Sequence, residues 1–506
     1  MQNNVLDYLD ETVRRLPDKT AFSDGESSYT FSELYGSIRS AATYILKAGL
    51  KREAVLVFMK RSPATVAAFF SVIAAGCYYV PIDEEMPAAR IRLIAENVKA
   101  RLCICDEDSF DKAEGFAAGA ERVIFSEIEK TAEDAAALDR VRDEAIDTDP
   151  LYIVFTSGST GVPKGVIACH RSVIEYIEQL SETLGFSEDT VFANQSPLYF
   201  DACLKELYPV IKFGATAYIT PKELFMYPVK LVEYLNLHRV NTVCWVVSAL
   251  TMISAFGTFD TVRPEYLRTV AFGSEVFPMK QFKLWRDALP AAAFTNLYGP
   301  TECTGMSCFF HVDRELADDE PIPIGRPFKN TRILLLDENG REAEEGEICI
   351  TGTCVTLGYY NNPVKTEEAF VQNPLNSAWR ETVYRTGDMG RRNSRGELVF
   401  VSRKDYQIKH MGHRIELGEI EANVNESEGI RLCGCVYHKE KERIVLYYTG
   451  DVEKAALLSE LKEKLPRYML PNHMERLEEM PFTPNGKIDR VRLLKMYEEL
   501  LASKKR

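Results

Sequence analysis

The segment FTSGSTGVPKG occupies residues 155–165, directly after the apolar run 151–154. An apolar run of this length predicts a buried strand, so the segment begins where a strand ends. Its glycines allow backbone N–H groups to turn inward, its hydroxyl groups add donors, and Lys164 adds a positive charge. It differs from the GxxxxGK[ST] pattern because Gly165 follows the lysine. The segment has the chemistry of a phosphate cradle, with an ordinary glycine- and serine-rich surface loop as the alternative.

Short apolar runs alternate with amphipathic stretches of helical length before and after this segment. The alternation predicts an α/β protein with a largely parallel sheet covered by helices. From about Arg332 the pattern changes to short strands joined by tight turns, as in RILLL, DENG and GEICITG, which predicts an antiparallel part. The apolar runs expected to form the parallel strands are 54–59, 102–105, 151–155, 242–247 and 269–272.

The apolar stretch 65–82 raises the question of a membrane span. Ser62 and Pro63 are typical of the start of a helix, and Gly76 is typical of its end. We therefore expect a buried helix followed by a strand at 78–82, and no membrane span.

The composition is that of a folded globular protein, with 46% hydrophobic residues and a formal net charge of −14. This charge has the wrong sign for binding nucleic acid or anionic lipid. The N-terminus lacks a secretion-signal pattern, so we expect a cytoplasmic protein, and we expect a monomer.

The twelve cysteines and seven histidines contain no CxxC or HExxH motif, which disfavours a zinc site. Residues 404–506 are close to neutral while the rest is acidic, which indicates a separate C-terminal module.

The loop and six other segments resemble the signature motifs of the adenylate-forming superfamily, which includes acyl-CoA synthetases, luciferases and peptide-synthetase adenylation domains. The resemblance runs essentially end to end. It implies a large N-terminal domain, residues 1–403, with mainly parallel sheets covered by helices and a small antiparallel, barrel-like part. A small, mobile α+β domain, residues 404–506, is expected to follow. The other segments, in the family's order, are YTFSEL (29–34), AAGCYYVPID (74–83), NLYGPTE (296–302), YRTGD (384–388), RKDYQIKHMGHRIELGEIE (403–421) and NGKIDR (485–490).

The resemblance implies a reaction in two steps. A carboxylate first attacks the α-phosphorus of ATP, which releases pyrophosphate and leaves an acyl-adenylate; positioning and charge stabilisation dominate such chemistry. Lys487 matches the residue that reaches the reacting oxygens, Glu302 matches a Mg²⁺ ligand, and Thr156 completes the catalytic set. The acyl group then moves to the phosphopantetheine thiol of a carrier protein, after the C-terminal domain swings about Asp405. Gly412 lies in the loop that would then face the thiol tunnel.

The nucleotide contacts also come from the resemblance. Tyr298 matches the aromatic residue that stacks on adenine, and Asn296 offers an amide to the purine edge. Asp388 matches the acceptor of both ribose hydroxyls, and Arg403 contacts the ribose side. The full set of implied ATP-binding residues is Thr156, Ser157, Gly158, Ser159, Thr160, Gly161, Lys164, Asn296, Leu297, Tyr298, Gly299, Pro300, Thr301, Asp388, Phe400, Arg403 and Lys487.

Asp201 indicates which carboxylic acid is activated. In amino-acid-activating members an aspartate at this place pairs with the α-ammonium of the substrate, whereas acyl-CoA and aryl-acid members generally lack it. The segments NQSPLYFDACLKELYP and AFGSEVFP also resemble the stand-alone D-alanine:carrier-protein ligases more than modular peptide synthetases. The implied pocket residues are Asp201, Ala202, Lys205, Trp245, Val270, Phe272, Leu297, Gly305 and Met306.

Lys205 departs from the D-alanine ligases, which have an apolar residue at this place. If its ammonium points inward, the substrate has to bring a carboxylate, as glutamate or another acidic amino acid would. If it extends outward or pairs with Glu206 or another acid, Trp245 and Phe272 fill the space and a small residue such as alanine fits.

The leading hypothesis is a free-standing amino acid adenylating ligase that uses ATP and Mg²⁺ and loads a separate carrier protein. An acyl- or aryl-CoA ligase is the first alternative, which Asp201 disfavours. A catalytically silent sensor on the same fold is the second, which the retention of Lys487, Glu302 and Asp388 disfavours.

Overall fold

The computed structural model describes residues 2–117, 119–157, 162–404, 407–482 and 488–503. The chain forms two compact units. Segments 85–97 and 156–164, expected in the first domain, group with the C-terminal residues. Unit 1 comprises Met1–Glu84, Val98–Phe155 and Gly165–Lys404, and unit 2 comprises Glu85–Asn97, Thr156–Lys164 and Asp405–Arg506.

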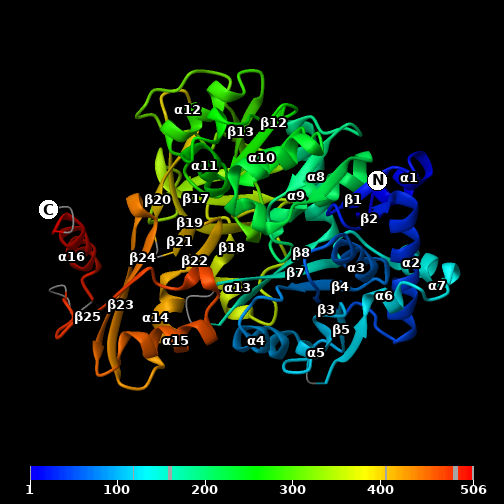
Figure 1. Cartoon of the computed structure of the whole chain (residues 1–506), viewed down its shortest axis with the longest axis horizontal. Coiled ribbons are helices and arrows are strands. Elements are labelled where there is room, and N and C mark those ends of the chain that lie inside the picture. Colours follow the sequence, from blue (N-terminus) through cyan, green and yellow to red (C-terminus); the bar gives the residue numbers. More distant parts are fainter. Residues whose placement is uncertain (1, 118, 158–161, 405–406, 483–487, 504–506) are drawn as a thin grey trace. The chain divides into compact units, whose positions relative to one another are not determined.

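One sheet of the described chain has six strands, and it contains three of the predicted apolar runs (Figure 1). The strand pairs β3–β4, β3–β5, β5–β6 and β4–β7 are parallel, as the alternating pattern predicts. Its strands, in order across the sheet, are β6 (Glu121–Ile124), β5 (Leu102–Cys105), β3 (Ala54–Phe58), β4 (Tyr78–Ile82), β7 (Pro150–Thr156) and β8 (Lys164–Cys169). Helices connected with it are α2 (Phe31–Lys47), α3 (Pro63–Ala74), α5 (Phe110–Ala113), α6 (Phe125–Ile128) and α7 (Ala135–Glu144).

Helix α3 confirms the interpretation of the apolar stretch 65–82 as a helix followed by a strand. The Ser62 hydroxyl accepts a hydrogen bond from the Thr65 N–H at 3.3 Å, which caps the first turn. Gly76 then takes a left-handed conformation with φ of +67°, and the chain enters β4. Within the described ranges, no helix combines the length and the apolar character that crossing a bilayer requires.

The second large sheet has nine strands within the described chain, and β9 to β13 form its parallel centre. Its strands, in order, are β15 (Arg326–Pro327), β14 (Cys308–His311), β13 (Ala293–Tyr298), β12 (Thr269–Gly273), β11 (Thr242–Val246), β9 (Val191–Asn194), β10 (Thr216–Ile219), β1 (Thr20–Ser23) and β2 (Ser28–Thr30). Helices connected with it are α1 (Asp7–Arg15), α8 (His170–Leu184), α9 (Leu204–Phe213), α10 (Pro228–Leu237), α11 (Val247–Ala255) and α12 (Met279–Ala288).

The two faces of this sheet belong to different hydrophobic clusters. Side chains alternate between faces along a strand. Cys244, Ala271 and Leu297 therefore pack on the side of α8 and α9, in a cluster that also includes α2, α3 and the six-stranded sheet. The neighbouring residues Trp245 and Phe272 pack on the side of α10, α11 and α12. The loops at the ends of β11, β12 and β13 are thus held between two packed layers.

A five-stranded antiparallel sheet completes unit 1 and confirms the predicted change of pattern after residue 332. The Asp337–Arg341 turn joins its first two strands, and Gly340 takes a φ of +75° there. Its elements are β16 (Thr331–Leu336), β17 (Glu345–Gly352), β19 (Thr382–Arg392), β18 (Phe370–Gln372), β20 (Leu398–Arg403) and the nearby helix α13 (Pro363–Ala369). The parallel sheets and the antiparallel part together confirm the α/β fold class.

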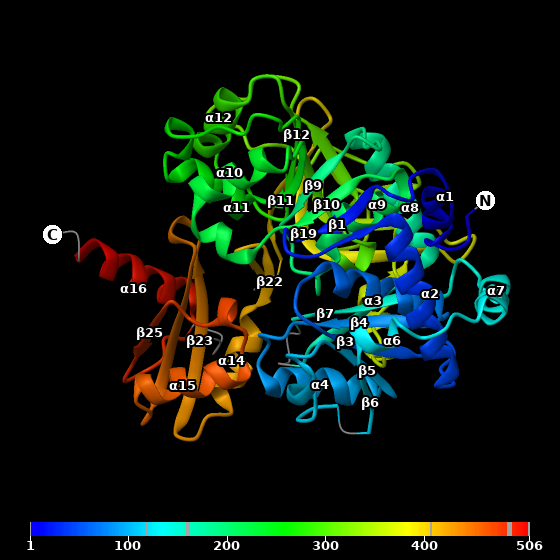
Figure 2. The same ribbon diagram turned by 45° about the vertical axis from the view of Figure 1, so that its right-hand side comes forward.

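Unit 2 contains a three-stranded sheet with helices on both faces (Figure 2). Helices α14 and α15 pack on one face through Ile420 and Leu461, and α16 packs on the other through Leu493 and Tyr497. A separate hairpin turns at Met411 and Gly412, whose φ values of 53° and 79° fit a two-residue turn. The elements of unit 2 are α4 (Ala88–Val98), β21 (Gln407–His410), β22 (His413–Glu416), α14 (Leu417–Asn425), β23 (Ile430–His438), β24 (Arg443–Gly450), α15 (Lys454–Lys464), β25 (His473–Arg476) and α16 (Arg490–Ser503).

A buried ion pair connects α4 to α14. Arg90 Nη1 pairs with Glu419 Oε1, and the two side chains are only 5% and 1% exposed. Glu419→Gln keeps the shape of the side chain but removes the charge that balances Arg90, so we expect the free energy of unfolding to fall by about 3 kcal/mol. Urea denaturation followed by circular dichroism measures this change.

Arg431 and Asp451 provide the matched control, because both side chains of this ion pair are 73% exposed. Arg431→Met is expected to change the free energy of unfolding by less than about 1 kcal/mol. Equal effects of the two substitutions would mean that the Arg90–Glu419 pair does not stabilise unit 2.

Candidate active site

The structure brings together three of the residues expected to contact the nucleotide. Tyr298 ends β13, and its phenol donates a hydrogen bond to Asp388 Oδ2 at 2.6 Å. Arg403 Nη1 donates to Asp388 Oδ1 at 2.7 Å, because Asp388 and Arg403 face each other across β19 and β20. Burial and the nearby Asp388 carboxylate raise the pKa of Tyr298 well above its usual range, so the phenol stays protonated and remains a donor.

The neighbours of Tyr298 complete this part of the site. Asn296 is 7% exposed, and its Nδ2 donates to the Pro323 carbonyl at 2.9 Å, so this donor of its amide is already used. Phe400 packs against the same hydrophobic cluster as Tyr298. A ribose or purine that enters would meet groups whose positions are fixed by hydrogen bonds and packing.

Glu302 is fully buried and is held from two sides. Tyr359 donates its hydroxyl to Glu302 Oε1 at 2.8 Å, and the N–H and hydroxyl of Thr356 donate to the Glu302 carbonyl at 3.0 and 2.9 Å. The sequence prediction did not include Tyr359 or Thr356. A single oriented carboxylate fits Mg²⁺ bound mainly by phosphates and water. In the part of the chain that the structure describes, no three His, Cys, Asp or Glu side chains are grouped to hold a metal ion by themselves.

Gly299 follows Tyr298, and there is no space for a side chain at this position. A Cβ would lie 2.3 Å from the Gly305 carbonyl oxygen and 2.6 Å from Met306 Cα, both of which are backbone atoms. Gly299→Ala is therefore expected to displace the segment beside Tyr298, lower the free energy of unfolding by about 1–3 kcal/mol and weaken ATP binding. Thermal unfolding and an ATP titration measure both effects.

Gly36 is the matched control, because it lies within α2 and a Cβ there meets no atom within 4 Å. Gly36→Ala is expected to leave ATP binding unchanged and to raise helix stability by roughly 0.5–1 kcal/mol. If Gly299→Ala bound ATP as tightly as Gly36→Ala, the packing at the end of β13 would not position the nucleotide.

The glycine- and serine-rich segment begins at the end of β7. Thr156 is 4% exposed, and its hydroxyl has no hydrogen-bond partner among the described residues. The Ser157 hydroxyl donates to the Arg414 carbonyl of β22 at 2.8 Å, within unit 2. Lys164 starts β8. The predicted residues Gly158, Ser159, Thr160, Gly161, Asp405 and Lys487 lie outside the described residues.

Asp201 begins a short 3-10 helix, Asp201–Cys203, directly before α9. Its side chain is buried, and burial raises its pKa to about 6, while a hydrogen bond with Thr301 and the charge of Lys205 oppose the increase. Tyr176 of α8 also lies close: burial and the negative charge of Asp201 raise its pKa well above the usual range, and a Cβ added to Gly305 would be 3.4 Å from its hydroxyl oxygen. Tyr176 was not predicted from the sequence.

Lys205 is 1% exposed, so the expectation that it extends outward to solvent is wrong. Lys205 belongs to α9, and its positive charge opposes the increase that burial causes in the pKa values of Asp201, Glu206 and Cys244. Burial raises the pKa of Glu206 to about 7, with Lys205 opposing the increase.

The other predicted pocket residues lie on two faces of the sheet. Leu297 and Met306 share the cluster of α8 and α9, whereas Trp245, Val270 and Phe272 belong to the cluster of α11 and α12. Trp245 is fixed there, because its indole N–H donates to the Ala193 carbonyl at 2.7 Å. Ala202 lies on the short helix of Asp201, and Gly305 follows the NLYGPTE segment.

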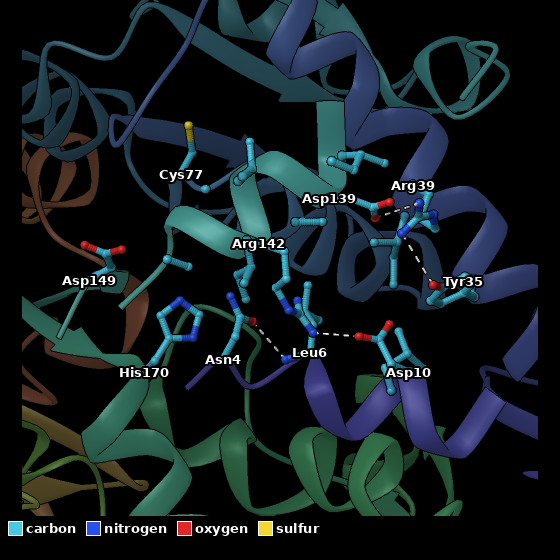
Figure 3. A pocket seen from close by; sticks show the side chains of 18 of the residues that line it. Asn4, Leu6, Asp10, Tyr35, Arg39, Cys77, Asp139, Arg142, Asp149 and His170 are labelled. Atoms are coloured by element: carbon cyan, nitrogen blue, oxygen red, sulfur yellow. Dashed lines mark hydrogen bonds and ion pairs between the residues drawn. The ribbon is translucent and has the colours of Figure 1, made fainter. Parts of the chain in front are cut away.

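A cavity of about 150 Å³ lies elsewhere in unit 1 (Figure 3). It is lined by residues of α1, α2, α3 and α7, and none of the predicted site residues borders it. Its arginines are already paired, with Arg142 bound to Asp10 at 2.8 Å and Arg39 bound to Glu133 at 2.7 Å. The cavity therefore has little capacity to bind an anion such as a nucleotide phosphate.

Comparison with known proteins identifies the family. The model of the AMP-binding enzyme family matches residues 9–360. The chain is 32% identical over 501 residues to surfactin synthase subunit 2 of Bacillus subtilis (strain 168), which covers 97% of this chain and 14% of that protein. It is 30% identical over 516 residues to zwittermicin A synthase ZmaJ of Bacillus cereus, which covers 97% of this chain and 94% of that protein.

Solved structures share the fold. Holo-PA1221, an NRPS protein containing adenylation and PCP domains, matches with a TM-score of 0.83 and 26% identity over 98% of this chain and 84% of that one. The o-succinylbenzoate CoA synthetase MenE from Bacillus subtilis matches with a TM-score of 0.83 and 19% identity over 98% of both chains, which shows the fold alone. The chain therefore belongs to the AMP-binding enzyme family of adenylate-forming proteins.

Proposed function

We propose that this protein activates an α-amino acid as an aminoacyl-adenylate, with ATP and Mg²⁺, and transfers it to the phosphopantetheine thiol of a separate carrier protein. The observation that carries the proposal is Asp201, a buried carboxyl whose pKa of about 6 leaves it charged at neutral pH. A buried carboxylate needs a cation, and the α-ammonium of an amino acid supplies one.

The first step would use the residues that the family resemblance implies. Asp388 accepts hydrogen bonds from Tyr298 and Arg403 and would also receive the ribose hydroxyls. The Thr156 hydroxyl, which has no hydrogen-bond partner among the described residues, would be available to an ATP phosphate at the end of β7. Glu302 would hold Mg²⁺, which neutralises phosphate charge. Lys487 would contact the reacting carboxylate and the α-phosphate.

The second step requires a carrier and a rearrangement about Asp405 that brings Gly412 to the thiol. The hairpin of Gly412 already contacts the phosphate segment through Arg414 and Ser157. Similarity to holo-PA1221, an NRPS protein that contains adenylation and PCP domains, supports a carrier as the acceptor. Residues 404–506 are proposed to form the second domain, which would move between the two steps.

A CoA ligase is the second candidate, because MenE has the same fold. Coenzyme A and a carrier protein present the same phosphopantetheine arm, so the acceptor distinguishes the two functions. The purified protein would be incubated with ATP, Mg²⁺, a panel of amino acids, and either a phosphopantetheinylated carrier or coenzyme A. We expect the aminoacyl thioester, read by mass spectrometry, to form on the carrier. Thioester on coenzyme A at an equal or greater rate would favour the CoA ligase.

A further inference from the structure

The segment 356–360, between β17 and α13, forms a strap along β8. The Ile167 N–H of β8 donates to the Gly358 carbonyl at 3.0 Å, and the Tyr360 N–H donates to the Gly165 carbonyl at 2.7 Å. The strand β8 follows the glycine- and serine-rich segment directly. The strap is therefore fixed to the strand in which the proposed phosphate segment ends.

The same strap holds Glu302. The N–H and the hydroxyl of Thr356 donate to the Glu302 carbonyl, and the Tyr359 hydroxyl donates to Glu302 Oε1 at 2.8 Å. Just before the strap, the Cys354 carbonyl accepts a hydrogen bond from the Thr304 hydroxyl at 2.8 Å. Both the backbone and the carboxylate of Glu302 are thus connected to β8 through one short segment.

Tyr359 has little freedom to move. It is only 7% exposed, and its N–H donates to Thr366 Oγ1 of α13 at 3.0 Å. Its ring meets Phe370 of β18 edge to face, with the ring centroids 5.5 Å apart and the planes at 80°. The position of the Tyr359 hydroxyl is therefore determined by α13 and β18 as well as by the strap.

A hydroxyl that is fixed in this way restricts the orientation of the carboxylate that it donates to. Carboxylates that bind metal ions are commonly oriented by such neighbours, and removal of one typically weakens metal binding by about 10- to 100-fold. Glu302 is fully buried, so water cannot readily replace the lost donor.

We propose that Tyr359 is a positioning residue for the metal site: its hydroxyl orients the Glu302 carboxylate for Mg²⁺, and the strap fixes this carboxylate relative to β8. The inference rests on the proposed function, in which Glu302 holds Mg²⁺. Without the hydroxyl, the Glu302 carboxylate is free to rotate, and the metal ion binds less tightly.

The test is the binding of Mn²⁺, which prefers the same oxygen ligands as Mg²⁺, in the presence of a non-hydrolysable ATP analogue. Electron paramagnetic resonance measures the free Mn²⁺. Tyr359→Phe is expected to raise the Kd for Mn²⁺ by about 10- to 100-fold. Tyr360→Phe is the matched control, because the ring of Tyr360 faces Tyr78, with the centroids 6.4 Å apart, and it should leave the Kd unchanged. Equal Kd values for the two variants would overturn the inference.

Combination with Glu302→Gln tests whether Tyr359 acts through Glu302. Glu302→Gln alone is expected to weaken Mn²⁺ binding, and adding Tyr359→Phe should weaken it no further, because residues in direct contact do not act independently. Effects that simply add would overturn the inference, since Tyr359 would then act by another route. Unchanged Mn²⁺ binding in Glu302→Gln would contradict the proposed role of Glu302, and with it the inference.

Phe370→Leu takes the place of Tyr359→Phe in the same measurements if that variant does not fold, because it removes the ring that fixes Tyr359. Unchanged Mn²⁺ binding, or an effect that adds to that of Glu302→Gln, would then overturn the inference. The titration requires no amino acid. Exchange with no amino acid in the unsubstituted protein would therefore contradict the proposed function, while the Mn²⁺ titration would still decide the role of Tyr359.

Discussion

Lys487→Ala is expected to reduce amino-acid-dependent ATP–pyrophosphate exchange by roughly 100- to 1000-fold, the effect of removing one positioned charge-stabilising group from an active site. The proposed adenylation step places an anionic carboxylate against an anionic α-phosphate. A lysine ammonium offsets the negative charge that develops between them, and no neutral side chain can do so. Exchange measured with labelled pyrophosphate gives the size of the loss.

The same variant separates the two half-reactions. Supplied with a synthetic aminoacyl-adenylate, Lys487→Ala should load the carrier at close to the normal rate, because Lys487 is proposed to serve only the first step. Lys495→Ala is the matched control, since Lys495 is an exposed residue of α16 in the same unit. Equal loss of both half-reactions in Lys487→Ala would refute this division of roles.

Asp201→Asn is expected to lower kcat/KM for the amino acid by roughly 30- to 1000-fold, which corresponds to about 2–4 kcal/mol for loss of one member of a buried charge pair. The amide keeps the shape of the side chain but cannot balance the α-ammonium. The apparent KM for ATP should change little, because the nucleotide is proposed to contact Asp388 and Tyr298 instead.

The pH dependence of the exchange provides an independent check on Asp201. Burial raises its pKa to about 6, so the free carboxyl becomes protonated as the pH falls through that value and no longer attracts an ammonium group. We expect kcat/KM to decrease below pH 6 and this decrease to disappear in Asp201→Asn. The exposed acid Asp189 is the control position, and Asp189→Asn should keep the normal profile. Full activity of Asp201→Asn at neutral pH would show that Asp201 does not bind the substrate.

Much of the fold could be predicted from the sequence, because local signals determine it. The strand β4 begins and ends where the apolar run 78–82 does, and Ser62 caps α3 as its type and position indicate. The antiparallel strands after residue 332 follow the alternation of turns and apolar runs. Such patterns depend only on residues that lie a few positions apart in the chain.

Contacts between distant segments could not be predicted in this way. The pairing of Arg90 with Glu419 joins residues that are far apart in the sequence, and neither residue type indicates the partner. The hydrogen bonds that connect Arg61 to Glu206 through Asn194 could not be predicted for the same reason. A weak signal exists for both Arg61 and Asn194, which lie at or just beyond the carboxyl ends of β3 and β9, where parallel sheets commonly place ligand-binding residues.

The sequence alone also could not predict whether the Lys205 side chain is buried. From the sequence alone an exposed and a buried position were both open, because α9 has polar residues on more than one side. The packing of α9 against the nine-stranded sheet decides it, since this face lies inside the cluster shared with α8. The same packing places Trp245 and Phe272 in a different hydrophobic cluster from Leu297, although the family resemblance implied that all three line one pocket.

The central claim, activation of an amino acid through its ammonium and carboxylate groups, is tested most directly by ATP–pyrophosphate exchange with paired acids that differ only in the α-amino group. Glutamate against glutarate and alanine against propionate are suitable pairs, with fatty and aryl acids added to the panel. The account predicts exchange with an amino acid and at least 100-fold less with its deamino analogue. Exchange with a fatty or aryl acid, and none with any amino acid, would contradict it.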